Sequence, residues 1–155
     1  MKLTGIHHVS ILVSDMERAV AWYSEKLGLK EVKRPSNFMT PVRWFELGEQ
    51  QIHLIPSDEP DAVSPRHMAL HVDDVQAARE VMARRGVEVR ETVPIAGADR
   101  FFIADPDGNN IELIQWFRRW DDWSEEELGV PDNQDRTMLL EDWQARKHSE
   151  LPTDR

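Results

Sequence analysis

Apolar and polar side chains alternate over residues 6–13, so this segment is predicted to form a β-strand. Asp15 follows as a good helix N-cap, and apolar residues then recur at helical spacing as far as Gly28, which has the position of a C-terminal cap. The apolar helix positions are Met16, Ala19, Val20, Tyr23 and Leu27. Further strands are expected over residues 29–32, 43–47 and 51–55, the last two joined by a turn at Gly48-Glu49.

The same pattern starts again after a proline-rich linker, residues 57–65. A strand over residues 67–72 precedes the N-cap Asp74 and a helix that ends at Gly86. Its apolar positions are Val75, Ala78 and Met82. A strand over residues 87–93 and a hairpin complete this half. Each half therefore reads as β-α-β-β-β, and the fold class is α+β.

The two halves align at a constant offset of 59 residues. The first strands give the pairs His8 with His67, Ile11 with Leu70, Val13 with Val72, and Asp15 with Asp74. The last strands give Ile52 with Ile111, His53 with Glu112, Leu54 with Leu113, and Ile55 with Ile114. Matching elements at one offset indicate an internal duplication. We expect one module over residues 1–56, a linker over 57–65, a second module over 66–117, and an extension over 118–155.

The segment 105–114 organises the second half. Asp105-Pro106-Asp107-Gly108 is a turn, because proline fixes φ at its second position and glycine accepts a left-handed conformation. In the strand that follows, Glu112 lies between two aliphatic residues and faces away from both Ile111 and Leu113. A carboxylate there could simply face water.

Three histidines favour a different interpretation of Glu112. His53 is the equivalent of Glu112 in the duplication, His8 and His67 are equivalent to each other, and all four side chains lie opposite their aliphatic neighbours. If the two sheets curve around a shared cavity, these side chains can converge. Three imidazoles and one carboxylate suit one divalent ion such as zinc, nickel, cobalt, iron or manganese. The sequence therefore predicts a metal site.

Composition narrows the choices further. The chain has 155 residues, no cysteine and a net charge of −10. Disulfides, thiolate ligands and a cysteine nucleophile are excluded, and nucleic acid is not an expected partner because no basic patch is visible. No apolar run is long enough for a membrane span and no signal-peptide layout is present, so a cytoplasmic location is the simplest expectation.

The sequence resembles the vicinal oxygen chelate superfamily, which includes glyoxalase I, methylmalonyl-CoA epimerase, fosfomycin-inactivating thiol transferases, bleomycin-binding proteins and extradiol dioxygenases. The resemblance covers about residues 4–116. It is carried by residues 8–15, Trp22-Tyr23 with Leu27-Gly28, residues 51–54, residues 67–70, and the turn 105–108 with residues 111–113. It implies two tandem βαβββ modules that form a cupped, eight-stranded open barrel around a metal.

In glyoxalase I and the epimerases, positions matching His8, His53, His67 and Glu112 bind the metal. The position of His53 is usually glutamate or glutamine there, so Glu112 is the one ligand carboxylate that this chain retains. The resemblance implies a glyoxalase- or epimerase-like lyase or isomerase, in which the metal chelates neighbouring substrate oxygens and Glu112 shifts a proton by way of an enediolate.

Two alternatives to a lyase or isomerase stay open. The first is an iron(II) dioxygenase of the extradiol type, because His8, His67 and Glu112 also form its two-histidine, one-carboxylate set. The second is a non-catalytic binding or resistance protein that keeps the cavity and needs no metal. All three act on a small molecule.

Other side chains could contribute to the pocket. His71 lies two residues beyond His67 on the same face, where an acid–base role is possible. Four apolar side chains, Phe38, Met39, Trp44 and Phe102, could wall a substrate pocket or simply pack in the core. Arg43 and Arg100 fall at nearly equivalent positions and could hold a substrate carboxylate.

The C-terminal extension is rich in tryptophan. Trp120, Trp123 and Trp143 are three of the six in the chain, and two short helices are expected around them. Such helices cannot form a core alone. We expect them to cover the modules or a second subunit, in a homodimer.

Overall fold

The computed structural model describes residues 1–59, 64–93, 95 and 97–118. They belong to one compact unit, Met1–Arg118. The predicted C-terminal helices with Trp120, Trp123 and Trp143 lie outside the described residues. Within these residues, no helix has the length and hydrophobicity needed to cross a membrane.

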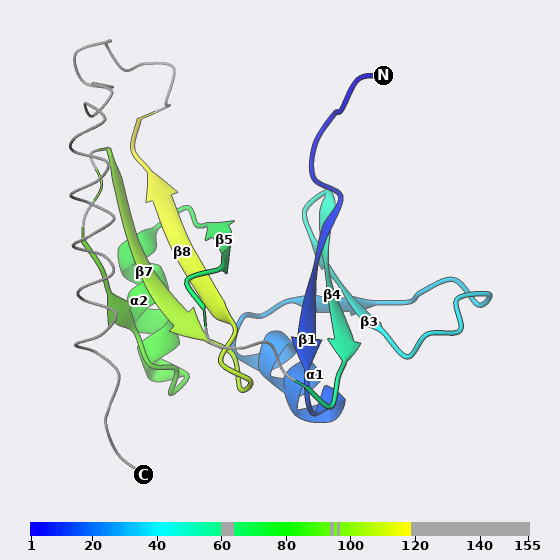
Figure 1. Cartoon of the computed structure of the whole chain (residues 1–155). Coiled ribbons are helices and arrows are strands. Elements are labelled where there is room, and N and C mark those ends of the chain that lie inside the picture. Colours follow the sequence, from blue (N-terminus) through cyan, green and yellow to red (C-terminus); the bar gives the residue numbers. More distant parts are fainter. Residues whose placement is uncertain (60–63, 94, 96, 119–155) are drawn as a thin grey trace. The chain divides into compact units, whose positions relative to one another are not determined.

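The first module contains five elements (Figure 1). They are β1 (His8–Val13), α1 (Met16–Glu25), β2 (Lys30–Val32), β3 (Arg43–Leu47) and β4 (Gln50–Pro56). The strands form one sheet in the order β1-β4-β3-β2, in which β1 runs parallel to β4 and the other neighbours are antiparallel. The parallel pair needs a long crossover connection, and α1 with the β2–β3 segment supplies it.

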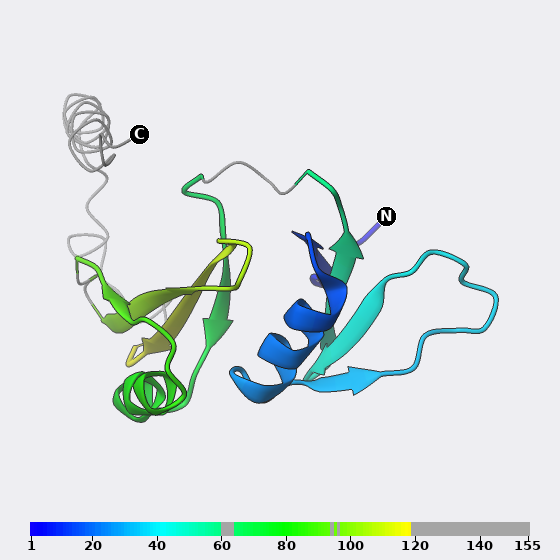
Figure 2. The same cartoon turned by 90° about the horizontal axis from the view of Figure 1, so that it is seen from below.

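The second module repeats this arrangement with β5 (His67–His71), α2 (Val75–Arg84), β6 (Arg90–Glu91), β7 (Ala98–Ala104) and β8 (Asn110–Trp116). Its sheet has the order β5-β8-β7-β6. Figure 2 shows each module as a sheet with its own helix. Two four-stranded sheets of the same topology confirm the predicted pair of βαβββ modules.

The helix boundaries agree with the sequence because their caps are built as predicted. The carboxylates of Asp15 and Asp74 accept hydrogen bonds from the backbone N–H of Arg18 and Ala77, three residues on. Gly28 has a φ of 74°, where a residue with a side chain would be strained. The strand predicted over residues 87–93 is shorter in the structure and covers only Arg90–Glu91. Val87 instead packs into the core.

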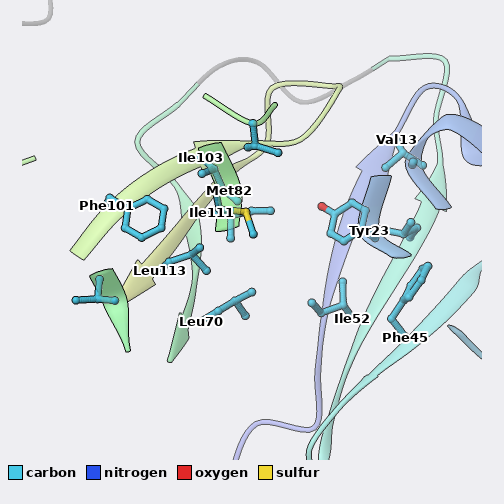
Figure 3. Packing of buried hydrophobic residues seen from close by; sticks show 14 residues of the cluster. Val13, Tyr23, Phe45, Ile52, Leu70, Met82, Phe101, Ile103, Ile111 and Leu113 are labelled. Carbon is cyan, nitrogen blue, oxygen red and sulfur yellow. The ribbon is translucent and has the colours of Figure 1, made fainter. Parts of the chain in front are cut away.

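The core follows the strand alternation (Figure 3). One face of each sheet meets its helix, and the residues there are fully or nearly buried: Val13, Tyr23, Phe45, Ile52 and Leu54 in the first module, and Leu70, Met82, Phe101, Ile103, Ile111 and Leu113 in the second. The opposite faces carry His8 and His67, both exposed. The duplicated pattern thus leaves the candidate ligands on the faces that the helices do not cover.

The turn at residues 105–108 joins the two modules. Asp105 is 5% exposed, and its carboxylate accepts from the backbone N–H of Asp107 and of Asn109, each at 2.9 Å. It also accepts from the Asn109 side chain at 2.8 Å and from the hydroxyl of Tyr23, on α1, at 3.0 Å. Burial, followed by the Asp105 charge, raises the pKa of Tyr23, so the hydroxyl keeps the proton that it donates.

A second set of contacts reflects the duplication. The ammonium of Lys26 donates to the carbonyl of Arg85 at 2.8 Å, and the guanidinium of Arg85 donates to the carbonyl of Lys26 at 2.5 Å. These residues are 59 positions apart and both follow the last turn of a helix. Each basic side chain therefore satisfies an end carbonyl of the other helix, which is the reciprocity expected of a local two-fold relation.

Replacing Tyr23 with Phe tests the contact between modules. The change keeps the ring and removes the donor, so a buried carboxylate oxygen loses one partner, which costs ~1–3 kcal/mol of unfolding free energy. Urea unfolding of wild type, Tyr23→Phe, Asp105→Asn and the double variant measures the coupling between the two side chains. A Tyr23→Phe protein as stable as wild type would contradict the assignment.

Candidate active site

The first half-site is a row of rings across one sheet. The imidazoles of His8 and His53 are stacked with their centroids 4.1 Å apart and their planes 16° from parallel. Trp44 lies on the other side of His53 at 4.5 Å and 5°. The register explains this order, because Trp44 on β3 is the direct partner of His53 on β4, and β1 is the next strand across. Phe38 extends the row with an edge contact to Trp44 at 5.5 Å.

Neighbouring side chains determine the tautomer of His53 and the orientation of His8. The amide oxygen of Gln51 lies 2.8 Å from Nε2 of His53 and can only accept, so Nε2 carries the hydrogen and Nδ1 keeps its lone pair. Nδ1 of His8 lies 3.0 Å from Nδ1 of His7. His7 thus orients His8.

His53 is held in its neutral form. Burial lowers its pKa below the ordinary value of 6.5, and the neighbouring charges of His8 and His7 lower it further. A neutral imidazole is the form that binds metal ions.

The second half-site is His67 on β5 and Glu112 on β8, at the equivalent strand positions. Nε2 of His67 lies 3.1 Å from one carboxylate oxygen of Glu112, Oε2. The other oxygen, Oε1, accepts from Arg100 on β7 at 2.7 Å. Glu112 is 5% exposed, so its charge is buried, and the guanidinium of Arg100 compensates it. Phe102 completes the group, with its ring edge-on to His67 at 5.1 Å.

The geometry of His67 matches that of a metal-binding histidine. Nδ1 lies 2.9 Å from the carbonyl of Pro65, an acceptor, so Nδ1 carries a hydrogen. In the neutral ring, the lone pair of Nε2 then faces a carboxylate, which only a second proton or a cation between them makes favourable. Two ligand atoms that each lie ~2.1 Å from one ion are roughly 3.0–3.4 Å apart, and Nε2 of His67 and Oε2 of Glu112 have such a separation. Metal-binding histidines also commonly donate their other N–H to a carbonyl, as His67 does to Pro65.

The four predicted ligands are brought together as two pairs. His8 meets His53, and His67 meets Glu112. Across the described parts of the single chain, no group of three or more histidine and acidic side chains is arranged to hold an ion. His71, the other predicted catalytic residue, is exposed on β5, and its side chain forms no hydrogen bond or ion pair with another described residue.

A cleft of about 230 Å³ lies between the free edges of β1 and β5. His67 lines it together with Met68 and Ser10, while the other three predicted ligands do not. Of the half-sites, only that of the second module opens on this cleft.

Arg43 and Arg100 have nearly equivalent positions in the sequence, but they lie on opposite faces of their sheets. Arg43 is paired with Leu54, whereas Arg100 is paired with Ile114, the equivalent of residue 55. The one-residue difference places the two arginines on opposite faces of their sheets. Arg43 forms an ion pair with Glu31, and Arg100 alone reaches a predicted ligand. The sequence did not predict the contact between Arg100 and Glu112, because the length of the hairpin turn sets the register of β7 against β8.

The lowered pKa of His53 predicts how stability responds to acid in metal-free protein. Because the folded-state pKa is below 6.5, the unfolded chain binds more protons near that pH, so unfolding free energy rises with pH. Stability is therefore lost as the pH falls through 6.5, until it passes the folded-state pKa. Urea unfolding between about pH 7.5 and 5.5 should show a steeper loss in wild type than in His53→Gln. Equal losses would contradict it.

Comparison with known proteins agrees with this topology. A lactoylglutathione lyase from Salmonella typhimurium is 31% identical over 123 residues, which cover 70% of this chain and 90% of the relative. The crystal structure of a glyoxalase family protein from Bacillus anthracis superposes with a TM-score of 0.70 at 27% identity, covering 75% of this chain and 98% of the other. TnmS3, an antibiotic-binding protein from Streptomyces sp. CB03234, gives 0.61 at 28% identity with the same coverage.

The model of the Glyoxalase/Bleomycin resistance protein/Dioxygenase superfamily matches residues 5–113, which include both half-sites. With its duplicated βαβββ modules, the chain belongs to this superfamily.

Proposed function

We propose that the protein is a metal-dependent lyase or isomerase of the glyoxalase type, acting on a small molecule with two neighbouring oxygens. The observation that carries the proposal is the pair formed by His67 and Glu112. Its nitrogen and oxygen are spaced as two ligands of one ion, and the Pro65 carbonyl fixes the imidazole tautomer. The lactoylglutathione lyases among the relatives favour this class of reaction.

His8 and His53 would supply the other two ligands from a second copy of the chain. Each pair by itself gives two donors, and a divalent ion of this kind takes four or more. In a homodimer, the first module of one copy faces the second module of the other, so that two half-sites make one site and complete the barrel around it. The neutral state of His53 suits it to this role.

A bound divalent ion would act as a Lewis acid on the two substrate oxygens. The chain's own residues would do the rest. Glu112 would move the proton, since it is the only carboxylate among the four residues, and the buried position of its side chain keeps competing water away. The row formed by Trp44 and Phe38 would give the substrate an apolar wall.

Glu112→Gln keeps the shape of the side chain and removes its charge. We expect turnover of metal-loaded protein to fall by at least ~10²-fold while the fold is retained, because general-base catalysis is commonly worth that factor. Formation of lactoylglutathione from methylglyoxal and glutathione is the assay. Unchanged turnover would move the base to another residue, with His71 the next choice, and no turnover in wild type would exclude this substrate.

Mixing two inactive variants tests the shared site. One variant is His8→Ala/His53→Ala, and the other is His67→Ala/Glu112→Gln. Neither should bind metal alone, but a mixed dimer contains one intact combination of pairs and should bind one ion per two chains. Native mass spectrometry after exchange of subunits measures the result. Mixed dimers without metal, or metal-binding monomers of wild type, would contradict the shared site.

A metal-free binding protein is the second candidate. Arg100 already compensates the charge of Glu112 in the absence of an ion. The likeness to TnmS3 points in the same direction. Metal analysis of freshly purified protein separates the two candidates, since an enzyme of the proposed kind retains stoichiometric metal.

A further inference from the structure

Arg100 is placed to do more than balance a charge. Its side chain is 21% exposed, while that of its partner Glu112 is 7% exposed. One Nη1 hydrogen bond reaches Glu112, and a long one from Nη2, at 3.4 Å, reaches the carbonyl of Val93. The buried Nε has no partner among the described residues. Most of the five N–H donors of this guanidinium are therefore uncommitted within the described part of the chain.

Arg79 shows what a structural arginine of this fold looks like. Every nitrogen of its guanidinium is bonded, to Glu91 and Asp99 and to the carbonyl of Arg100. The cation also lies over the ring of Phe101, 5.1 Å from its centroid. Burying a guanidinium with unused donors is costly, and Arg79 avoids that cost. Arg100, on the opposite face of β7, does not.

We propose that Arg100 recognises an anionic group of the substrate, most simply a carboxylate beside the two chelating oxygens. This inference deepens the proposed function and rests on it. The guanidinium of this partly exposed side chain offers donors in the planar geometry that carboxylates accept. The guanidinium carbon lies over the ring of Phe102, 5.7 Å from its centroid, which favours the cation at this place.

The local charge supports an anion. A divalent ion and one guanidinium against the single carboxylate of Glu112 leave two positive charges at the site when the three histidines are neutral. The whole chain carries a net charge of −10, so this positive centre lies in an otherwise repelling field. An anion that also binds the metal is favoured there, while anions without such contacts are discouraged.

Recognition through Arg100 would also prepare the base. In the free protein, the guanidinium donates to Oε1 of Glu112 at 2.7 Å, so this oxygen already has a hydrogen-bond partner. A substrate carboxylate that takes over the guanidinium leaves Oε1 without its partner. The proton-moving group then becomes available only when the correct substrate is bound.

The experiment compares two probes on cobalt-loaded, full-length protein. Acetohydroxamate presents two neighbouring oxygens, and malonohydroxamate presents the same two with an added carboxylate. Titration followed by cobalt absorption gives a dissociation constant for each. We expect wild type to bind the carboxylated probe at least about tenfold more tightly, the range of one charge-assisted contact. In Arg100→Gln the preference should vanish, with binding of acetohydroxamate within about threefold of wild type.

Two further variants make the outcome specific. Arg100→Lys keeps the charge without the planar fork and should retain part of the preference, even if Arg100→Gln folds poorly. Arg43→Gln removes an arginine from the other face of the first sheet and should leave the preference unchanged. No preference in wild type, or a preference that survives in Arg100→Gln, would overturn the inference. Protein that binds neither cobalt nor acetohydroxamate would instead show that the proposed function fails, and the inference with it.

Discussion

The buried carboxylate of Asp105 is the interaction on which the rest of this structure depends. It accepts four hydrogen bonds, which matches the number of lone-pair sites that a carboxylate offers. Three close the turn that aligns β7 with β8, and the fourth comes from Tyr23 of the other module. One group thus sets both the register that places Glu112 opposite Phe102 and the contact between modules. The turn motif is buried at a junction and is not an exposed loop tip, which explains why a charge is kept there.

The two modules share one backbone topology but carry different side chains at their equivalent candidate ligand positions. At equivalent strand positions the first module has Trp44, His53 and His8, three stacked rings, while the second has Phe102, Glu112 and His67. In the first half-site, burial and the neighbouring charges of His8 and His7 lower the pKa of His53 and favour its neutral form. The second half-site holds the buried charge of Glu112, which the cationic side chain of Arg100 compensates. A pair of neutral nitrogens and a charged pair are complementary ligand sets, which is what a shared divalent site requires.

The faces of β7 separate structure from function. Arg79 and Phe101 lie on the helix side, where every donor of the guanidinium is bonded and stability is the result. Arg100 and Phe102 lie on the other side with the same residue types in the same order, yet the donors there are largely unused. Alternation along β7 therefore turns Phe101 toward the core, where Arg79 of α2 covers it, and turns Arg100 and Phe102 toward the candidate site.

The sequence by itself determined the elements, the duplication and the identity of the four candidate ligands. Those follow from periods of 2 and 3.6 residues, from caps such as Asp15 and Asp74, and from one offset, all of which are local or repeated signals. Only the tertiary structure decided that the ligands form two pairs, that His67 is oriented by Pro65, and that Arg100 and not Arg43 reaches Glu112. The length of the hairpin turns sets the strand register, and a difference of one residue moves a side chain to the other face. Such contacts join residues far apart in the chain, and no local pattern records them.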